Sequence, residues 1–284
     1  MGDQAPLVGQ PIAVQPPADT ALERTICPRT GFALVQSSGQ TAFRIAKTSY
    51  GPMNPPLRGV KEDRREWGRW DVVGHRTIYS GSPEPCAYAE SLAWAKPAID
   101  IQLSDLFDPS DEDEKAVEDV TLEEAVAQEW ADRHHMMLGC VPAGWRQERL
   151  LHQLVLPSGG WFVDIEAAET ISAITKQWTD LLVGAEVSEL TTAHLHGEKR
   201  SLTTGIAEKI HASMLADGSY AHGIIYSSKH DAGWRCWAIW LRALDDGKTI
   251  LSEPTRTDSG RTIEEPNQNP ALKRVSDLFG FRCH

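Results

Sequence analysis

The sequence predicts an α+β fold, in which strands and helices mix without the regular alternation of βαβ units. Short apolar runs with strand character, such as TAFRIA at 41–46, are interspersed with longer runs of helical spacing, such as residues 201–218. Turn signals separate these runs, for example SSGQ and the pair Asp217-Gly218. The 284 residues fit one large domain or two small ones, and no internal repeat occurs.

The chain begins with a segment of weak structural character. Residues 1–22 are rich in Pro, Gln and Ala and predict a loose arm, which we place within an N-terminal arm of residues 1–40. FALVQ at 32–36 and TAFRIA at 41–46 predict strands on either side of the SSGQ turn. Residues 50–68 contain three prolines and several charges, and they predict a long loop.

A short strand and a helix follow this loop. HRTIYSG at 75–81 predicts the strand, and SPEPCAYAESLAW at 82–94 predicts the helix, with Ser82 as its cap and Pro83 in its first turn. Glu90 lies on a small, apolar face of this helix, where an unpartnered carboxylate would cost several kcal/mol. Helical spacing places it beside Cys86, Ala87, Ala93 and Trp94.

The next part of the chain is acidic. IDIQL predicts a strand, and the run DPSDEDEKAVED predicts a solvated loop that lacks the glycine and terminal glutamate of an EF-hand. Residues 121–137 predict a helix in which Thr121 and Glu124 form a capping box. We treat residues 97–168 as an acidic insertion.

The second half of the chain alternates hairpin and helix signals. LLHQLVLPS and GWFVDI predict a hairpin around the PSGG turn, with the second strand at 161–165. Residues 169–183 predict an amphipathic helix, and residues 201–218 predict a helix that stops at Asp217-Gly218. HGIIYSS and RCWAIWLRAL predict strands joined through KHDAGW. The polar tail at 244–284 contains one short helix signal, NPALKRVSDLFGF.

Composition excludes several classes of protein. The net charge of −12 argues against a nucleic-acid binder, although local arginines can still hold a small anion. No apolar run is long enough to span a membrane, and the N-terminus lacks the pattern of a secretory signal. The five cysteines form no CxxC pair, which favours a reducing, cytoplasmic location over a disulfide framework.

Common catalytic and metal-binding motifs are missing. His134 and His135 are adjacent, so on a helix they point about 100° apart, and no HExxH spacing occurs. His194 and His196 would point the same way from a strand, but we expect surface histidines and no metal site. The chain contains no GxSxG, P-loop or GxGxxG.

A few polar residues in apolar segments are better candidates. Arg44 alternates with Phe43 and Ile45 along its strand, so its side chain faces solvent or a cleft. Arg69 lies between two tryptophans, and Tyr79 ends the strand before the Glu90 helix. Ser227 and Ser228 end a buried strand, where a hydroxyl is ordinarily a turn residue.

Together these segments resemble the RES domain, a family named for its Arg, Glu and Ser. Four blocks carry the resemblance in order: FRIAKTSYGPMNPP, GRWDVVGHRTIYSGSPEPCAYAESLA, SLTTGIAEKI and GIIYSSKHDAGWRCWAIW. They span residues 41–243. GRWD replaces the family's more familiar GRWN, and the double serine leaves the choice between Ser227 and Ser228 open, with the register favouring Ser228.

The resemblance implies an ADP-ribosyltransferase-like fold, with a mixed or antiparallel sheet surrounded by helices, and an enzyme that consumes NAD without a metal. The implied catalytic residues are Glu90, Arg44 and Ser228. The implied NAD-binding residues are Arg44, Tyr79, Arg69, Tyr50 and Ser228. Arg44 would hold the pyrophosphate, Tyr79 would contact the nicotinamide, Glu90 the ribose, and Ser228 would position its neighbours.

The implied reaction cleaves the nicotinamide–ribose bond through an oxocarbenium-like transition state that a carboxylate stabilises. Water, phosphate or a protein side chain would each serve as acceptor, giving a glycohydrolase, a phosphorylase or an ADP-ribosyltransferase. Many RES proteins are toxins paired with an Xre-type helix-turn-helix antitoxin, which implies such a partner here. The alternatives are a non-catalytic binding module, a secreted or injected effector, and an unrelated hydrolase that uses Glu90 with Asp71 or Asp164.

Overall fold

The α+β class is confirmed by the computed structural model, which describes residues 23–97, 139–247 and 252–284. The predicted loose arm at 1–22, the IDIQL strand, the acidic loop and the helix at 121–137 lie outside these residues. In the described part, no helix combines the length and the apolarity that a membrane crossing requires.

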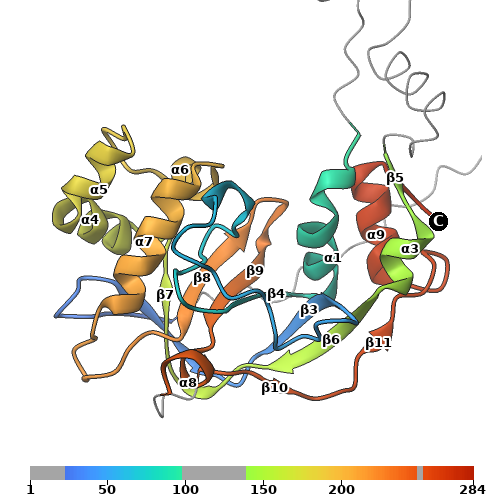
Figure 1. Ribbon diagram of the computed structural model, residues 1–284, viewed down its shortest axis with the longest axis horizontal. Helices are drawn as coiled ribbons and strands as arrows, with labels where there is room; N and C mark the ends of the chain where they lie inside the picture. Colours follow the sequence, from blue (N-terminus) through green and yellow to red (C-terminus); the bar gives the residue numbers. More distant parts are fainter. Residues whose placement is uncertain (1–22, 98–138, 248–251) are drawn as a thin grey trace, which may run out of the picture.

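One large mixed sheet organises the described residues (Figure 1), and ten of their strands belong to it in the order β1-β2-β7-β8-β9-β4-β3-β6-β10, with β11 also on β6. Among the described strands of this sheet, only β7 and β8 pair in parallel. The strands are β1 (Arg24–Ile26), β2 (Ala33–Ser38), β3 (Thr41–Lys47), β4 (Thr77–Ser82), β6 (Arg149–Val155), β7 (Ser158–Asp164), β8 (Gly223–Ser228), β9 (Asp231–Trp240), β10 (Thr255–Arg256) and β11 (Arg261–Thr262). A separate pair joins β5 (Cys140–Val141) to β12 (Arg282–Cys283).

Strand pairing differs from the sequence expectation at two turns. The hairpin predicted around PSGG is wrong, because β6 pairs with β3 while β7 pairs with β2 and β8. The strands on either side of SSGQ exist but do not pair with each other either. The two turns bond to one another instead, through Gly39 N to Pro157 O at 3.2 Å and Leu156 N to Gln40 O at 2.9 Å. The turn residues therefore determine where each strand ends, whereas contacts with distant segments determine which strand it pairs with.

The predicted hairpin at the end of the sheet is confirmed. β8 and β9 pair antiparallel, with Tyr226 opposite Cys236, and β9 begins at Asp231, earlier than the sequence suggested. This hairpin lies in the middle of the sheet, between β7 and β4. In the strand order it therefore lies between one group formed by β1, β2 and β7 and another that includes β4, β3 and β6.

Several helices begin or end at other residues than predicted. Ser82 ends β4, so α1 starts at Glu84 after Pro83, which makes no side-chain cap bond. The helix predicted at 169–183 breaks at Trp178, whose ring packs against Phe32 with centroids 5.7 Å apart. The helices are α1 (Glu84–Leu92), α3 (Ala143–Gln147), α4 (Ala168–Gln177), α5 (Thr179–Gly184), α6 (Thr192–His196), α7 (Arg200–Ala212), α8 (Arg242–Asp246) and α9 (Pro270–Phe279), with 3₁₀ turns η1 (Arg64–Glu66) and η2 (Ala93–Ala95).

Two further expectations are corrected near α7. His194 and His196 lie in helix α6 and not in a strand, so their side chains do not share one face as expected. Helix α7 ends at Ala212, before the predicted stop at Asp217-Gly218, and Met214 then forms a β-bridge with Tyr220. The short helix predicted in the tail is confirmed as α9, which packs against α1.

Side-chain alternation gives the sheet two apolar faces. The larger core combines strand residues such as Ile224 and Trp240 with the helices, and the smaller core contains residues of opposite parity, such as Ile225 and Ile239. Figure 1 shows two groups of helices, α4 to α7 on the left and α1, α3 and α9 on the right, with β8 and β9 visible between them. The candidate site lies where α1 and the start of α7 approach these central strands.

Candidate functional site

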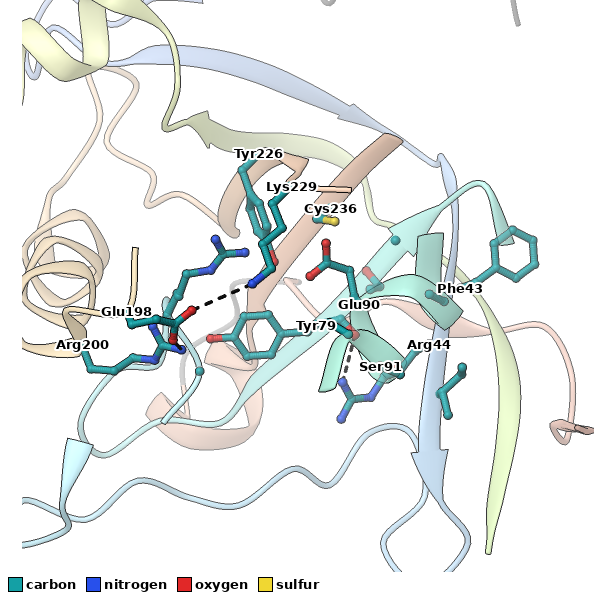
Figure 2. Close-up of a pocket in the computed structure, with 17 residues that line it drawn as sticks. Phe43, Arg44, Tyr79, Glu90, Ser91, Glu198, Arg200, Tyr226, Lys229 and Cys236 are labelled. Atoms are coloured by element: carbon teal, nitrogen blue, oxygen red, sulfur yellow. Dashed lines mark hydrogen bonds and ion pairs between the residues drawn. The ribbon is translucent and has the colours of Figure 1, made fainter. Parts of the chain in front are cut away.

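A cavity of about 330 Å³ is bordered by α1, β3, β4, the β8–β9 hairpin and the start of α7 (Figure 2). Its volume lies at the lower end of the range for small-molecule sites. Four of the residues singled out in the sequence line it directly: Arg44, Arg69, Tyr79 and Glu90. The polar and aromatic residues that join them are Phe43, Ser80, Ser91, Glu198, Arg200, Tyr226, Lys229 and Cys236.

Glu90 points from α1 into this cavity. Its Oε1 accepts a hydrogen bond of 2.7 Å from the Ser228 hydroxyl, and it forms no ion pair within the described residues. Ala87 in α1 and Ala93 in η2 line the cavity as expected, whereas Cys86 is buried outside its lining and Trp94 is exposed. The small residues therefore leave open space beside the carboxylate, and Glu90 is not a core residue neutralised by an arginine.

The two adjacent serines have different partners. Ser228 is 4% exposed, donates to Glu90, and accepts a hydrogen bond of 3.1 Å from the His230 amide. The Ser227 hydroxyl accepts from Arg235, and its amide donates to Glu166. Only Ser228 is bonded to Glu90, because successive strand residues point to opposite faces.

Arg44 occupies a gap between two strands. β3 and β4 pair through Phe43 and Gly81 only, and the Arg44 guanidinium donates from Nη1 to the carbonyl of Tyr79 at 2.9 Å. The Arg44 Nε is buried without a hydrogen-bond partner, and no carboxylate in the described ranges pairs with this side chain. Burial lowers the pKa of Arg44 to about 10. A buried cation with an unused donor favours the approach of an anion.

Tyr79 is held by the GRWD segment. Its hydroxyl donates to Asp71 Oδ1 at 2.7 Å and accepts from the Trp70 amide at 2.9 Å. Asp71 also pairs with Arg58 at 2.6 Å, so this aspartate holds an arginine as well as the tyrosine. Burial, together with the Asp71 charge, raises the pKa of Tyr79 well above its ordinary value. The ring is thus neutral and fixed.

Tyr226 is a cavity residue that the sequence analysis missed. It lies on β8 two residues before Ser228, on the same strand face, and this alternation was a usable signal. The Arg69 guanidinium carbon lies 5.2 Å from the centroid of its ring. Arg69 Nη1 also contacts His196 Nδ1 at 3.3 Å, and His196 Nε2 lies 2.5 Å from Glu166 Oε1.

The Glu166–His196 pair holds Arg69 in place through the contact between His196 and Arg69. Burial alone would raise the pKa of Glu166, but hydrogen bonds from His196 and from Ser227 lower it below its ordinary value. The carboxylate therefore stays charged and orients the imidazole that contacts Arg69. Arg69 is consequently held beside the Tyr226 ring.

The remaining predicted residue, Tyr50, does not line the cavity. It lies in the turn after β3 and is 59% exposed. The opposite rim carries charges that no sequence motif indicated: Glu198 pairs with Arg200 at 2.6 Å and lies 3.9 Å from Lys229. Figure 2 shows this charged group on the side of the cavity away from Arg44.

The site combines a positioned carboxylate with two tyrosine rings and with cationic side chains on opposite sides of the cavity. Comparison of the chain with family models, curated proteins and solved structures finds no match. The functional assignment therefore depends on this geometry and on the motifs in the sequence.

Proposed function

We propose that the chain cleaves the nicotinamide–ribose bond of NAD, as a glycohydrolase or a phosphorylase of the RES type. The observation that carries the proposal is the contact between Ser228 and Glu90 at 2.7 Å, in a cavity that Arg44 and Tyr79 also line. These are the four side chains to which the resemblance gives individual roles. They come from four separate segments of the chain; Arg44, Tyr79 and Glu90 line one cavity and Ser228 is bonded to Glu90, which supports the assignment.

Glu90 is the proposed catalytic carboxylate. Cleavage of the bond develops positive charge on the ribose, and a carboxylate nearby stabilises it. The stabilisation is greater in a cavity where few water molecules screen the charges. Ser228 donates to one carboxylate oxygen and leaves the other for a ribose hydroxyl. Nicotinamide departs as a neutral molecule, so the reaction requires no acid to protonate it.

We assign the aromatic side chains to the nicotinamide ring of NAD and the Arg44 side chain to its diphosphate. Tyr79 and Tyr226 offer ring faces for the nicotinamide, and the bond from Tyr79 to Asp71 fixes one of these rings. Arg44 is the proposed partner of the diphosphate, because its buried charge pairs with no carboxylate among the residues that the structure describes. The cavity volume of about 330 Å³ suits the nicotinamide–ribose half, which leaves the adenosine half outside.

The biological role implied by the resemblance is that of a toxin that depletes NAD and is restrained by an Xre-type helix-turn-helix antitoxin. The loop at 50–68 offers exposed apolar side chains for such a partner, since Leu57 is 50% and Val60 84% exposed. An antitoxin bound there would have to obstruct access to Arg44. Protection of NAD by a cognate helix-turn-helix protein would test this part of the proposal.

The test of the activity is product analysis after incubation of the purified chain with NAD, with and without inorganic phosphate. We expect wild-type protein to release nicotinamide, with ADP-ribose as the second product in water and its phosphorylated form with phosphate. Glu90→Gln should remain folded and lose turnover by about a hundredfold or more. Glu84→Gln is the matched control, because Glu84 lies on the same helix and pairs with Arg261 outside the cavity.

Two outcomes would refute the proposal. If wild-type protein releases no nicotinamide with water, phosphate or a protein acceptor, the chain is not an NAD-cleaving enzyme. If Glu90→Gln and Glu84→Gln both keep wild-type rates, the cleavage of NAD does not take place in this cavity. Covalent labelling of protein by NAD would instead support the ADP-ribosyltransferase alternative.

A further inference from the structure

A cluster of three potential metal ligands lies outside the cavity. His75 precedes β4, His211 lies in the last turn of α7, and Asp246 ends α8. One ligand atom from each residue lies within 4.8 Å of the other two. It is the only such group found in residues 23–97, 139–247 and 252–284, and none of its members lines the cavity.

The orientation of His75 is the first reason to regard this cluster as a site. Its Nδ1 lies 3.3 Å from Asp246 Oδ1, within reach of a hydrogen bond. The atom is nevertheless buried without a hydrogen bond to any described residue, because its direction does not match that of a donor to this oxygen. The His75 nitrogen is thus close to a carboxylate oxygen without a hydrogen bond to it, so it can donate its lone pair to a metal ion beside that oxygen.

The second reason is that His211, the third ligand, lies close to His75. The imidazole rings of His75 and His211 have centroids 4.1 Å apart and are tilted by 44°, so they are not stacked in parallel. Ligand atoms around a tetrahedral Zn²⁺ with bonds of about 2.1 Å lie about 3.4 Å apart. The widest pair in the cluster would have to close by at most about 1.4 Å from its limit of 4.8 Å, which small side-chain rotations provide.

The surrounding contacts hold the three backbone segments in place. The Arg76 amide donates to Asp245 at 2.6 Å, which fixes the segment of His75 against α8. Arg242 donates to the carbonyl of His211 at 2.7 Å, which fixes α8 against the end of α7. Such supporting bonds keep metal ligands close to their binding geometry before the ion arrives.

The ligand types and the charges around them limit the ions that this cluster can bind. Arg242 Nη1 lies 3.7 Å from Asp246 Oδ2, so one carboxylate oxygen faces a guanidinium while the other faces His75. Two imidazoles and one carboxylate oxygen suit zinc and its neighbours among the transition metals, and not Ca²⁺ or Mg²⁺, which prefer oxygen ligands throughout. Three protein ligands leave a fourth position for water.

We propose that His75, His211 and Asp246 bind one divalent transition-metal ion of the zinc type, with water as the remaining ligand. The ion would connect α7 and α8 to the segment that enters β4, four residues before Tyr79. The ligands are outside the cavity, so the ion would not contact a substrate bound there. The inference is independent of the proposed reaction with NAD.

The test uses the full-length chain without an affinity tag, since added histidines would themselves bind metal. After treatment with a chelator, the protein is titrated with Zn²⁺ by calorimetry and with Co²⁺ by visible absorption. We expect one ion per chain and the absorption of cobalt with nitrogen and oxygen ligands. Asp246→Asn and His75→Gln should each weaken binding by at least about tenfold.

The matched control is Asp258→Asn. Asp258 faces His152 at 4.0 Å in a second histidine–aspartate pair that belongs to no three-ligand group within the described residues. This variant should bind zinc as the wild type does. Circular dichroism identifies any variant that fails to fold, and if Asp246→Asn does so, His75→Gln decides. The proposal is overturned if wild-type protein binds no zinc, or if the folded ligand variants bind it as tightly as the control.

Discussion

Replacing Ser228 by alanine is the sharpest test of how the cavity is organised. The Ser228 hydroxyl is buried and donates to Glu90 at 2.7 Å, a short hydrogen bond to a carboxylate. A hydrogen bond to a charged group contributes about 1.5–3 kcal/mol. If this energy serves to hold Glu90 against the developing charge, kcat/KM should fall by about 10- to 150-fold in Ser228→Ala.

The adjacent serine provides the control. Ser227→Ala removes a hydroxyl that accepts from Arg235 and does not contact Glu90, so its rate should stay within about threefold of wild type. Nicotinamide release at several NAD concentrations gives kcat and KM for both variants, and thermal unfolding checks that both are folded. If Ser228→Ala matches Ser227→Ala in rate, the bond to Glu90 does not position the carboxylate and our reasoning is refuted.

Two further predictions concern stability. A methyl group at Gly68 would lie 2.3 Å from the Tyr79 hydroxyl, so Gly68→Ala should lower the free energy of unfolding by about 1–3 kcal/mol, whereas Gly144→Ala, with open space around it, should not lower it. Equal urea midpoints for the two variants would contradict this. Burial lowers the pKa of His230 from 6.5 to about 4, so the folded protein binds fewer protons than the unfolded chain in this window, and stability should fall as the pH drops from 6.5 towards 4. His230→Gln should flatten this dependence in urea titrations, and an unchanged slope would disprove it.

The helix that carries Glu90 shows which features can be predicted from the local sequence. Its existence, its small-residue face and the carboxylate on that face follow from helical spacing, and the structure agrees at Ala87 and Ala93. The first residue was misplaced because Ser82 continues β4 and pairs with Arg235. A strand-pairing partner far along the chain therefore overrode a local capping preference.

Residues that depend on long-range pairing were harder to predict. The PSGG and SSGQ turns have the composition of hairpin loops, but β6 and β7 find partners elsewhere in the sheet. Tyr226 could have been identified from its alternation with Ser228. Arg200 and Glu198 could not, because they reach the cavity only through the packing of α7, and periodicity carries no information about which helix end approaches a strand.

The central position of the β8–β9 hairpin has a consequence for biosynthesis. β1, β2 and β7 form one group of strands and β3, β4 and β6 another; in the sheet residues 223–240 lie between them, and the two groups also bond to each other at their turns. A ribosome-bound chain that lacks these residues cannot bring Ser228 to Glu90, however well its earlier segments have folded. The proposed activity is therefore withheld from nascent and truncated chains, so an NAD-degrading enzyme would arise only once most of its sequence has emerged.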